Sequence, residues 1–146
     1  MIATGFGVSV RFMREKLCNP MTHGRINVLI ADDDELFLES LRALIDHQPE
    51  LAVVAAARNG LEAVELAGEL SPDAAVIDLH MPLLDGVSTV SRLRRDHPHL
   101  CLIVLTGDSD TALHGAALEA GADGVFEKHE MARGLVERIA RGRSAA

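Results

Sequence analysis

Apolar and polar positions alternate along the chain with two different periods. From residue 26 onwards, short continuous apolar runs are separated by longer segments in which apolar residues recur every three or four positions. Short unbroken runs are typical of strands with both faces buried, and the three-to-four spacing is typical of helices that bury one face. The pattern therefore predicts β-strands alternating with α-helices over most of the chain.

Five apolar runs are predicted to be strands: Ile26–Ala31, Leu51–Ala57, Ala74–Asp78, 100–106 and Gly124–Glu127. Five segments with helical spacing follow them in turn, over residues 35–47, 61–70, 86–97, 109–120 and 130–141. On the first helix, the spacing places Phe37, Leu41 and Leu44 on the buried face, with Leu38 and Ile45 beside them.

Strands that are buried on both faces form parallel sheets covered by helices on each side. Connections as short as these require right-handed crossovers between parallel strands. The sequence therefore predicts an α/β fold: a three-layer α/β/α sandwich around a five-stranded parallel sheet, formed by a single domain over residues 25–141.

The two ends of the chain differ from this domain. Glycine and proline residues interrupt any period in residues 1–24, so we expect a poorly ordered N-terminal extension there. Met21 stands shortly before the first strand and is an alternative start of translation, and a basic docking arm is another interpretation of the extension. Residues 142–146 are expected to form a frayed tail.

Composition narrows the range of functions. A formal net charge of −8 at pH 7 is opposite to what a nucleic-acid surface needs. No apolar run approaches the length of about 20 residues that crosses a bilayer, and the N-terminus lacks the features of a secretory signal. Cys18 and Cys101 make no disulfide framework, and Cys101 lies in an apolar run, as a small buried hydrophobic residue would. We therefore expect a cytoplasmic protein without membrane contact.

Charged and polar residues stand where the predicted strands end. Asp32 and Asp33 follow the first strand, and Asp78 ends the third. Thr106 ends the fourth strand, and Lys128 follows the fifth. Ligands of open parallel sheets bind at the carboxyl ends of the strands, so these groups share one pocket if their strands are neighbours. Three carboxylates held together repel one another and favour a bound cation.

Carboxylate oxygens are ligands that Mg²⁺ prefers, and a magnesium site with few protein ligands suits phosphoryl chemistry. We expect Asp78 to be the nucleophile that takes a phosphoryl group as an acyl phosphate. Asp33 would bind Mg²⁺ directly and Asp32 through water. The backbone carbonyl of His80 would be another ligand.

Thr106 and Lys128 complete the predicted site. The Lys128 ammonium would neutralise charge on the phosphoryl oxygens, and the Thr106 hydroxyl would donate a hydrogen bond to one of them. Simpler structural roles suffice for three nearby residues. Asp34 is expected to stabilise the start of a helix, and Asp85 and Gly86 are expected to form a turn.

Four short motifs carry a family resemblance: Asp32-Asp33, residues 78–86 with the sequence DLHMPLLDG, Thr106-Gly107, and Gly121-Ala122-Asp123-Gly124 followed by Lys128. In this order they resemble the receiver domain of two-component response regulators, over about residues 26–141, and most closely the receivers of regulators with helix-turn-helix outputs. The resemblance implies a flavodoxin-like sheet in the order 2-1-3-4-5. It also implies a phosphorelay, in which a histidine kinase or histidine phosphotransfer protein phosphorylates Asp78. No enzyme is implied beyond Mg²⁺-dependent self-phosphorylation and autodephosphorylation.

Two positions depart from the family's pattern. Family members usually carry Tyr or Phe directly after the glycine of the fifth strand, where the ring moves on phosphorylation, and this chain has Val125. Phe126 is adjacent, but alternation along a strand points it to the opposite face. Many family members also have Pro after the lysine, where this chain has His129.

The output is predicted only in outline. The residues after Lys128 have room for one helix and not for a helix-turn-helix module, so we expect a stand-alone receiver without direct DNA binding. The resemblance implies an output surface formed by helix 109–120, strand Gly124–Glu127 and helix 130–141. Phosphorylation would bias this surface towards a protein partner or a homodimer. The kinase and the regulated process stay open.

Two alternatives belong to other functional classes. One is a phosphorylation-independent interaction module on the same fold, which the valine at position 125 weakly favours. The other is an aspartate-nucleophile phosphatase, whose D-x-D signature could be Asp32 and Asp34. The Thr or Val that should follow that signature is missing, and the motif around Asp78 would be unexplained.

Overall fold

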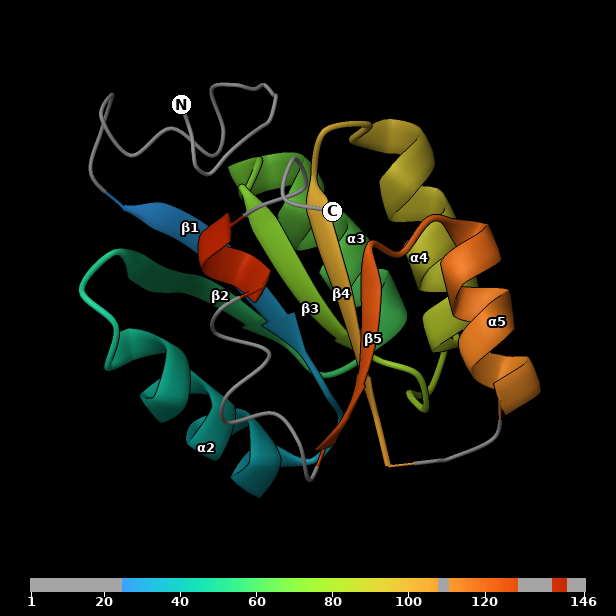
Figure 1. The fold of residues 1–146 in the computed structure, drawn as a ribbon, viewed down its shortest axis with the longest axis horizontal. Coiled ribbons are helices and arrows are strands. Elements are labelled where there is room, and N and C mark those ends of the chain that lie inside the picture. The colour runs from blue at the N-terminus through green and yellow to red at the C-terminus, as the bar shows by residue number, and fades with distance from the viewer. Residues whose placement is uncertain (1–24, 108–110, 129–137, 142–146) are drawn as a thin grey trace.

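The computed structural model describes residues 25–107, 111–128 and 138–141 (Figure 1). Its elements are β1 (Ile26–Ala31), α2 (Glu35–Asp46), β2 (Leu51–Ala57), α3 (Gly60–Leu70), β3 (Ala74–Asp78), α4 (Gly86–Asp96), β4 (Cys101–Thr106), α5 (Thr111–Ala120) and β5 (Gly124–Glu127). Residues 138–141 are helical, as predicted for the end of the last helix. The rest of that helix lies outside the described residues, as do the extension 1–24, the tail 142–146 and the first two residues of the helix predicted over 109–120.

The predicted strands are confirmed, and β4 begins one residue later than expected. The helix ends differ slightly, and capping explains one difference. Helix α3 begins at Gly60 because Asn59 caps it: the Asn59 side chain accepts a hydrogen bond from the Glu62 N–H at 2.8 Å. The Glu62 carboxylate in turn accepts from the Arg58 N–H at 2.8 Å. This reciprocal pair fixes the exit from β2.

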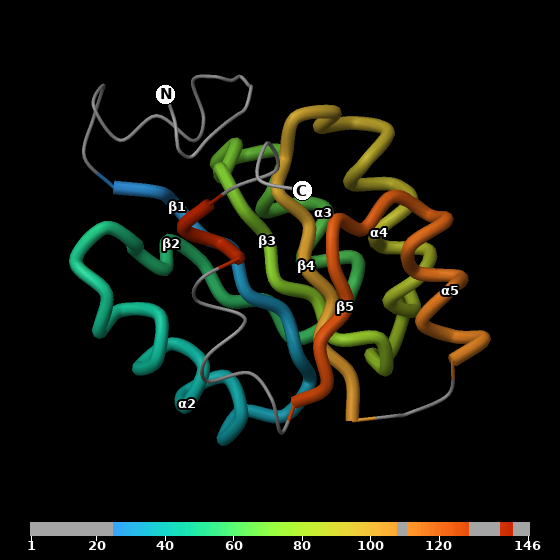
Figure 2. The backbone as a smooth tube through the Cα atoms, in the orientation of Figure 1, coloured from blue at the N-terminus to red at the C-terminus, as the bar shows by residue number. Residues whose placement is uncertain are grey.

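All five strands are parallel and lie in the order β2-β1-β3-β4-β5. The backbone trace in Figure 2 passes from β1 to the edge strand β2, returns to β3 and continues through β4 to β5. Both the parallel sheet and the expected order are therefore confirmed. This order places β1 and β3 side by side, so that the residues at their carboxyl ends are neighbours.

The alternating side chains of the sheet divide the core into two layers. Along β1, Leu29 and Ala31 pack with residues of α3, α4 and α5, whereas Val28 and Ile30 pack with α2 and Ile139. Helices α4 and α5 lie side by side over the first layer (Figure 1). Helices therefore cover both faces of the sheet, which confirms the three-layer sandwich.

The buried face of α2 differs from the prediction by one position. Leu38, Leu41 and Ile45 are buried, whereas Phe37 and Leu44 are half-buried at the margin of the same core layer. The spacing alone could not separate these two faces, because both contain Leu41. The Phe37 ring lies beside Lys128, which directly follows β5.

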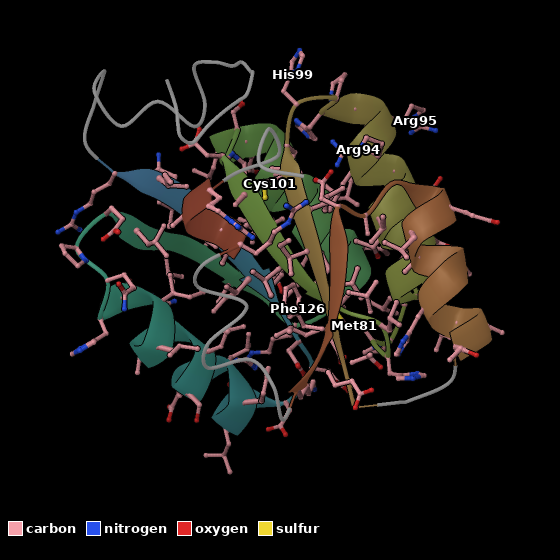
Figure 3. All side chains as sticks on the ribbon, viewed as in Figure 1. Met81, Arg94, Arg95, His99, Cys101 and Phe126 are labelled. Atoms are coloured by element: carbon pink, nitrogen blue, oxygen red, sulfur yellow. The ribbon has the colours of Figure 1, made fainter. Side chains whose placement is uncertain are left out.

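A largely buried ion pair lies at the end of the sheet where the strands begin. Arg94 of α4 meets Asp123 at 2.9 Å, and their side chains are only 18% and 11% exposed. The Arg94 guanidinium also donates to four backbone carbonyls, those of His97, Pro98, Leu100 and Gly121. Gly121 has a φ of +123°, and an added Cβ would lie 2.6 Å from the Arg94 side chain. Figure 3 shows Arg94 at the end of the sheet where Cys101 lies.

Within the described ranges, no helix combines the length and the apolar character that crossing a membrane requires.

Candidate functional site

Three carboxylates meet at the carboxyl edge of the sheet. Asp32 follows β1 and is 1% exposed, Asp78 ends β3 and is 4% exposed, and Asp33 is exposed. One oxygen from each carboxylate lies within 4.8 Å of the other two. The adjacency of β1 and β3 produces this cluster, because parallel strands bring their carboxyl ends to the same edge.

The two oxygens of Asp32 have different environments. Oδ1 accepts a hydrogen bond from the Asp34 N–H at 2.9 Å, which fixes the carboxylate against the start of α2. Oδ2 is fully buried and accepts no hydrogen bond from the described residues. Its charge is met by the Lys128 ammonium, whose Nζ lies 2.7 Å away as an ion pair. A buried carboxylate oxygen with unused lone pairs can bind a cation as a ligand or accept a hydrogen bond from water.

Lys128 follows β5, and its side chain reaches the acidic cluster. Its Nζ lies 2.7 Å from Asp32 Oδ2, 3.6 Å from Asp78 Oδ1 and 4.3 Å from the centre of the Phe37 ring. Burial works against the ammonium charge, but the Asp32 and Asp78 carboxylates outweigh that effect, so the pKa of Lys128 lies above its ordinary value. Lys128 is therefore a fixed positive charge in the pocket at neutral pH.

The pKa of Asp78 is raised from its ordinary 3.8 to about 6. Burial of the carboxylate is the main cause, and repulsion from Asp32 adds to it. The Lys128 ammonium and the backbone N–H of His80, which donates to the Asp78 carboxylate, lower the pKa by less. Asp78 is consequently a more basic carboxylate than usual, and it is still mostly ionised at neutral pH.

The other predicted site residues lie at the same edge. Thr106 is the last residue of β4 and is fully buried, and it follows Leu105, which is in register with Asp78. Gly107 is exposed directly after it. The His80 side chain is exposed, and its backbone N–H is bonded to Asp78. A metal-binding role for the His80 carbonyl stays a prediction.

A tight loop carries the chain from Asp78 into α4. The Leu84 N–H donates to the Pro82 carbonyl at 2.8 Å, which makes a γ-turn around Leu83. Leu83 has a φ of +71° and is 75% exposed. A leucine in this left-handed region is strained, and no burial of its side chain offsets the strain.

Gly86 and Asp85 end this loop as turn residues, as predicted, and Asp85 also caps the next helix. The Gly86 N–H donates to the Leu79 carbonyl at 3.0 Å. A Cβ on Gly86 would lie 2.4 Å from Leu79 Cα and 2.6 Å from the Asp78 carbonyl oxygen, so only glycine fits. Asp85 caps α4 by accepting from the Ser88 N–H, and that hydrogen bond lowers the pKa of Asp85.

Asp34 lies at the start of α2, as the sequence predicts, and the structure adds that its side chain caps the helix. Its carboxylate accepts hydrogen bonds from the Leu36 and Phe37 N–H groups, at 3.0 and 3.3 Å, and so caps α2. Those bonds hold Asp34 at the start of the helix and separate its role from that of Asp32.

Val125 and Phe126 point to opposite faces of β5, as alternation predicts. Val125 packs with the core layer under α3, α4 and α5, and Phe126 packs with the layer under α2. The face of β5 that contacts α5 therefore carries valine at the position where the family usually has an aromatic ring.

The donor set fits a hard divalent cation. All three clustered groups are carboxylates, one of their buried oxygens has unused lone pairs, and Asp78 holds its charge at a cost that a cation would remove. Asp32, Asp33 and Asp78 are therefore the residues that could hold a metal ion.

The contact between the Phe37 ring and the Lys128 ammonium is the feature of the site that the sequence did not predict. The spacing assigned it to the core face of α2, and the structure places its ring beside the Lys128 ammonium. The signal in the sequence was an aromatic residue in the first turn of the helix that follows two strand-end acids.

The comparisons with known proteins agree with this fold and pocket. The family model of the response regulator receiver domain matches residues 28–140. The transcriptional regulatory protein LnrK of Bacillus subtilis is 38% identical over 114 residues, covering 78% of this chain and 52% of LnrK. Protein-glutamate methylesterase/protein-glutamine glutaminase 2 of Carboxydothermus hydrogenoformans is 40% identical over 99 residues, covering 67% of this chain and 28% of that protein. The chain thus spans about half, or less, of the curated relatives it matches.

Among solved structures, the response regulator domain of Thermotoga maritima CheB superposes with a TM-score of 0.75 at 31% identity, covering 82% of this chain and 96% of that domain. The receiver domain of the NarL regulator from Mycobacterium tuberculosis gives a TM-score of 0.72 at 25% identity, covering 79% of this chain and 96% of that domain. Fold, strand order and sequence match all lead to one conclusion: the chain belongs to the family of response regulator receiver domains of two-component systems.

Proposed function

We propose that this chain is a phospho-accepting receiver, and that Asp78 takes a phosphoryl group from a phosphohistidine of a histidine kinase or a histidine phosphotransfer protein. The observation that carries the proposal is the meeting of Asp78 with two further carboxylates and the Lys128 ammonium at the carboxyl edge of the sheet. In this proposal the cluster supplies a nucleophile, a cation-binding acid pair and a fixed positive charge within a few ångströms of one another.

In the proposed reaction an Asp78 carboxylate oxygen attacks phosphorus. The bond from phosphorus to the imidazole nitrogen of the donor breaks, and that nitrogen keeps the electron pair. The raised pKa of Asp78 makes the carboxylate a better nucleophile than an exposed aspartate, while at neutral pH most of it is still ionised. The product is an acyl phosphate on Asp78.

Two groups of the chain stabilise the transferring phosphoryl group in this proposal. The Lys128 ammonium neutralises charge on its oxygens, and the Thr106 hydroxyl donates a hydrogen bond to one of them. Asp33 and Asp78 would hold Mg²⁺ directly, and Asp32 through water, with the His80 carbonyl as a further ligand. When bound, Mg²⁺ would supply charge neutralisation between the acids and the phosphoryl oxygens.

The phosphatase alternative is disfavoured by the role of Asp34. Its D-x-D signature would need the Asp34 carboxylate as an acid in the pocket, but that carboxylate caps α2 through two backbone N–H groups. We therefore expect self-phosphorylation and autodephosphorylation, without turnover of other phosphate esters. The interaction-module alternative is left to the experiment below.

The output is proposed to be a protein contact. Relatives include a protein named as a transcriptional regulator and others named as methylesterases, so the family serves different outputs. We propose that a partner, or a second copy of this chain, binds the surface that includes α5 and β5 and continues into the helix predicted over 130–141. We further propose that the receiver works in the cytoplasm and does not itself contact DNA.

Intact mass measurement tests the proposal. The protein is incubated with acetyl phosphate and Mg²⁺, and the expected product carries one phosphoryl group. Asp78→Asn protein and a sample treated with chelator should both stay unmodified. An adduct that persists in Asp78→Asn would assign the acceptor elsewhere, and no adduct on a folded wild-type protein would favour the phosphorylation-independent module.

A further inference from the structure

The Lys128 side chain links the end of β5 to an acid that follows β1. Lys128 follows β5 and Asp32 follows β1, and both β3 and β4 lie between these strands. The ammonium nevertheless lies 2.7 Å from Asp32. A long lysine side chain loses rotamer entropy when it is held in one place, so a group that restrains it would contribute to the geometry of the site.

Phe37 is placed to provide that restraint. The centre of its ring lies 4.3 Å from Lys128 Nζ, within the range of a cation–π contact. The Phe37 side chain also packs against the core layer under α2. The Lys128 side chain is 26% exposed, so the ring covers an ammonium that is only partly hydrated, and such contacts are stronger when water is excluded.

The Phe37 backbone is fixed relative to the acids of the pocket. The Asp34 carboxylate accepts from the Phe37 N–H at 3.3 Å, and the Asp34 N–H donates to Asp32 Oδ1 at 2.9 Å. One short segment therefore supplies both the carboxylate that pairs with the ammonium and the ring that contacts it. Asp78 of β3 is the third contact.

We propose that Phe37 is a positioning residue for Lys128. The Phe37 ring holds the Lys128 ammonium between Asp32 and Asp78, where the ammonium can meet a phosphoryl group. The proposal rests on the proposed phosphoryl transfer to Asp78. The competing explanation is that Phe37 only fills space at the margin of the core. The two explanations differ for leucine, which fills most of that space but has no quadrupole to attract a cation.

Nuclear magnetic resonance of the metal-free protein tests the contact without any reaction. The ring current of Phe37 should move the Lys128 side-chain Hε resonances upfield. Phe37→Leu should abolish this displacement, and Phe37→Tyr should keep it. Phe126→Leu is the matched control, because it removes a ring from the same core layer. Lys128 resonances at ordinary positions in the wild type would overturn the proposal.

The rate of phosphorylation by acetyl phosphate and Mg²⁺ tests the consequence. Phe37→Leu should slow the reaction by roughly threefold to thirtyfold, as expected for loss of a partly desolvated cation–π contact. Phe37→Tyr should restore the rate, and Phe126→Leu should leave it close to wild type. Equal slowing by Phe37→Leu and Phe126→Leu, in proportion to their loss of stability, would show a packing role only.

The two proposals fail in different ways. If the wild type takes no phosphoryl group on Asp78, the proposed function fails, whatever the state of the Phe37 contact. If the wild type is phosphorylated and Phe37→Leu reacts at an unchanged rate, only the positioning role is overturned.

Discussion

At the scale of single residues, Asp78 holds a charge that its surroundings disfavour. Its carboxylate is buried beside Asp32, and the nearby ammonium compensates only in part, because Lys128 lies closer to Asp32 than to Asp78. A group with a raised pKa in the folded state reduces stability whenever it is ionised. The metal-free protein should therefore be less stable at neutral pH than its packing would allow.

Asp78→Asn should raise the free energy of unfolding of the metal-free protein at pH 7.5 by about 2 to 3 kcal/mol. The folded-state pKa of about 6 lies above the ordinary 3.8, so the folded protein binds the proton more tightly than the unfolded chain does. The penalty is absent below the unfolded pKa and grows as the pH rises through about 6. Urea denaturation at pH 4.5 and 7.5 measures it.

Saturating Mg²⁺ provides the control for that experiment. The metal should stabilise the wild type and have much less effect on Asp78→Asn, because the variant lacks a charged ligand. Chelation should reverse the gain. Identical pH dependence in the two proteins would contradict the assignment of the raised pKa to Asp78.

At the scale of elements, the strands could be predicted because each is defined by its own residues. The run Ala74–Asp78 is buried along its whole length, so it is continuous in the sequence and has the same bounds in the structure. The most deeply buried face of α2 differs from the predicted face by one position. Phe37 and Leu38 are both apolar, so the sequence cannot tell which of them is buried more deeply.

The acidic pocket could be anticipated in part for a geometric reason. Residues that follow neighbouring parallel strands share one edge, so Asp32 and Asp78 had to be close once the strand order was expected. The ring of Phe37 over Lys128 and the Arg94–Asp123 pair could not be foreseen. Each depends on the distance between side chains from segments far apart in the sequence, which no local pattern records.

The loop between β3 and α4 gives a sharp test of backbone fit. Gly86→Ala should lower the free energy of unfolding by about 2 kcal/mol, because the new Cβ would press on three backbone atoms: Leu79 Cα, the Leu79 carbonyl oxygen and the Asp78 carbonyl oxygen. Since one of these atoms belongs to Asp78, phosphorylation by acetyl phosphate should also slow. Chemical denaturation and intact mass follow the two effects.

Gly68→Ala is the matched control. Gly68 lies within α3, and a Cβ there would have no atom within 4 Å. Alanine favours a helix more than glycine does, so this variant should gain about 0.5 to 1 kcal/mol. Similar losses in both variants would mean that the backbone contacts at Gly86 are not the limiting factor.

At the scale of the whole molecule, the two ends of the strands carry different charged groups. Charged groups at the carboxyl edge form the pocket, and the ion pair of Arg94 and Asp123 closes the other edge. Arg94 satisfies four carbonyls besides its carboxylate, so it fixes the end of α4, the entry to β4 and the end of α5 together.

Arg94→Met should lower the free energy of unfolding by about 3 kcal/mol, because it removes a largely buried ion pair with Asp123 and takes the guanidinium donor away from four backbone carbonyls. Arg95→Met is the matched control. Its ion pair with Asp96 is exposed, and its loss should cost less than about 1 kcal/mol. Thermal or urea denaturation compares them. Equal losses at the two arginines would show that the buried network contributes nothing beyond a surface pair.

The Arg94 contact also has a mechanical consequence for α5. The Arg94 guanidinium donates a hydrogen bond to the Gly121 carbonyl, just past the C-terminal end of this helix. The other end of the helix, at Thr111, follows the segment that leaves β4 after Thr106. A rigid rod of about 15 Å that is anchored at one end is displaced most at the other. A rearrangement near Thr106 would therefore tilt α5 like a lever about Arg94, moving Thr111 further than Leu118.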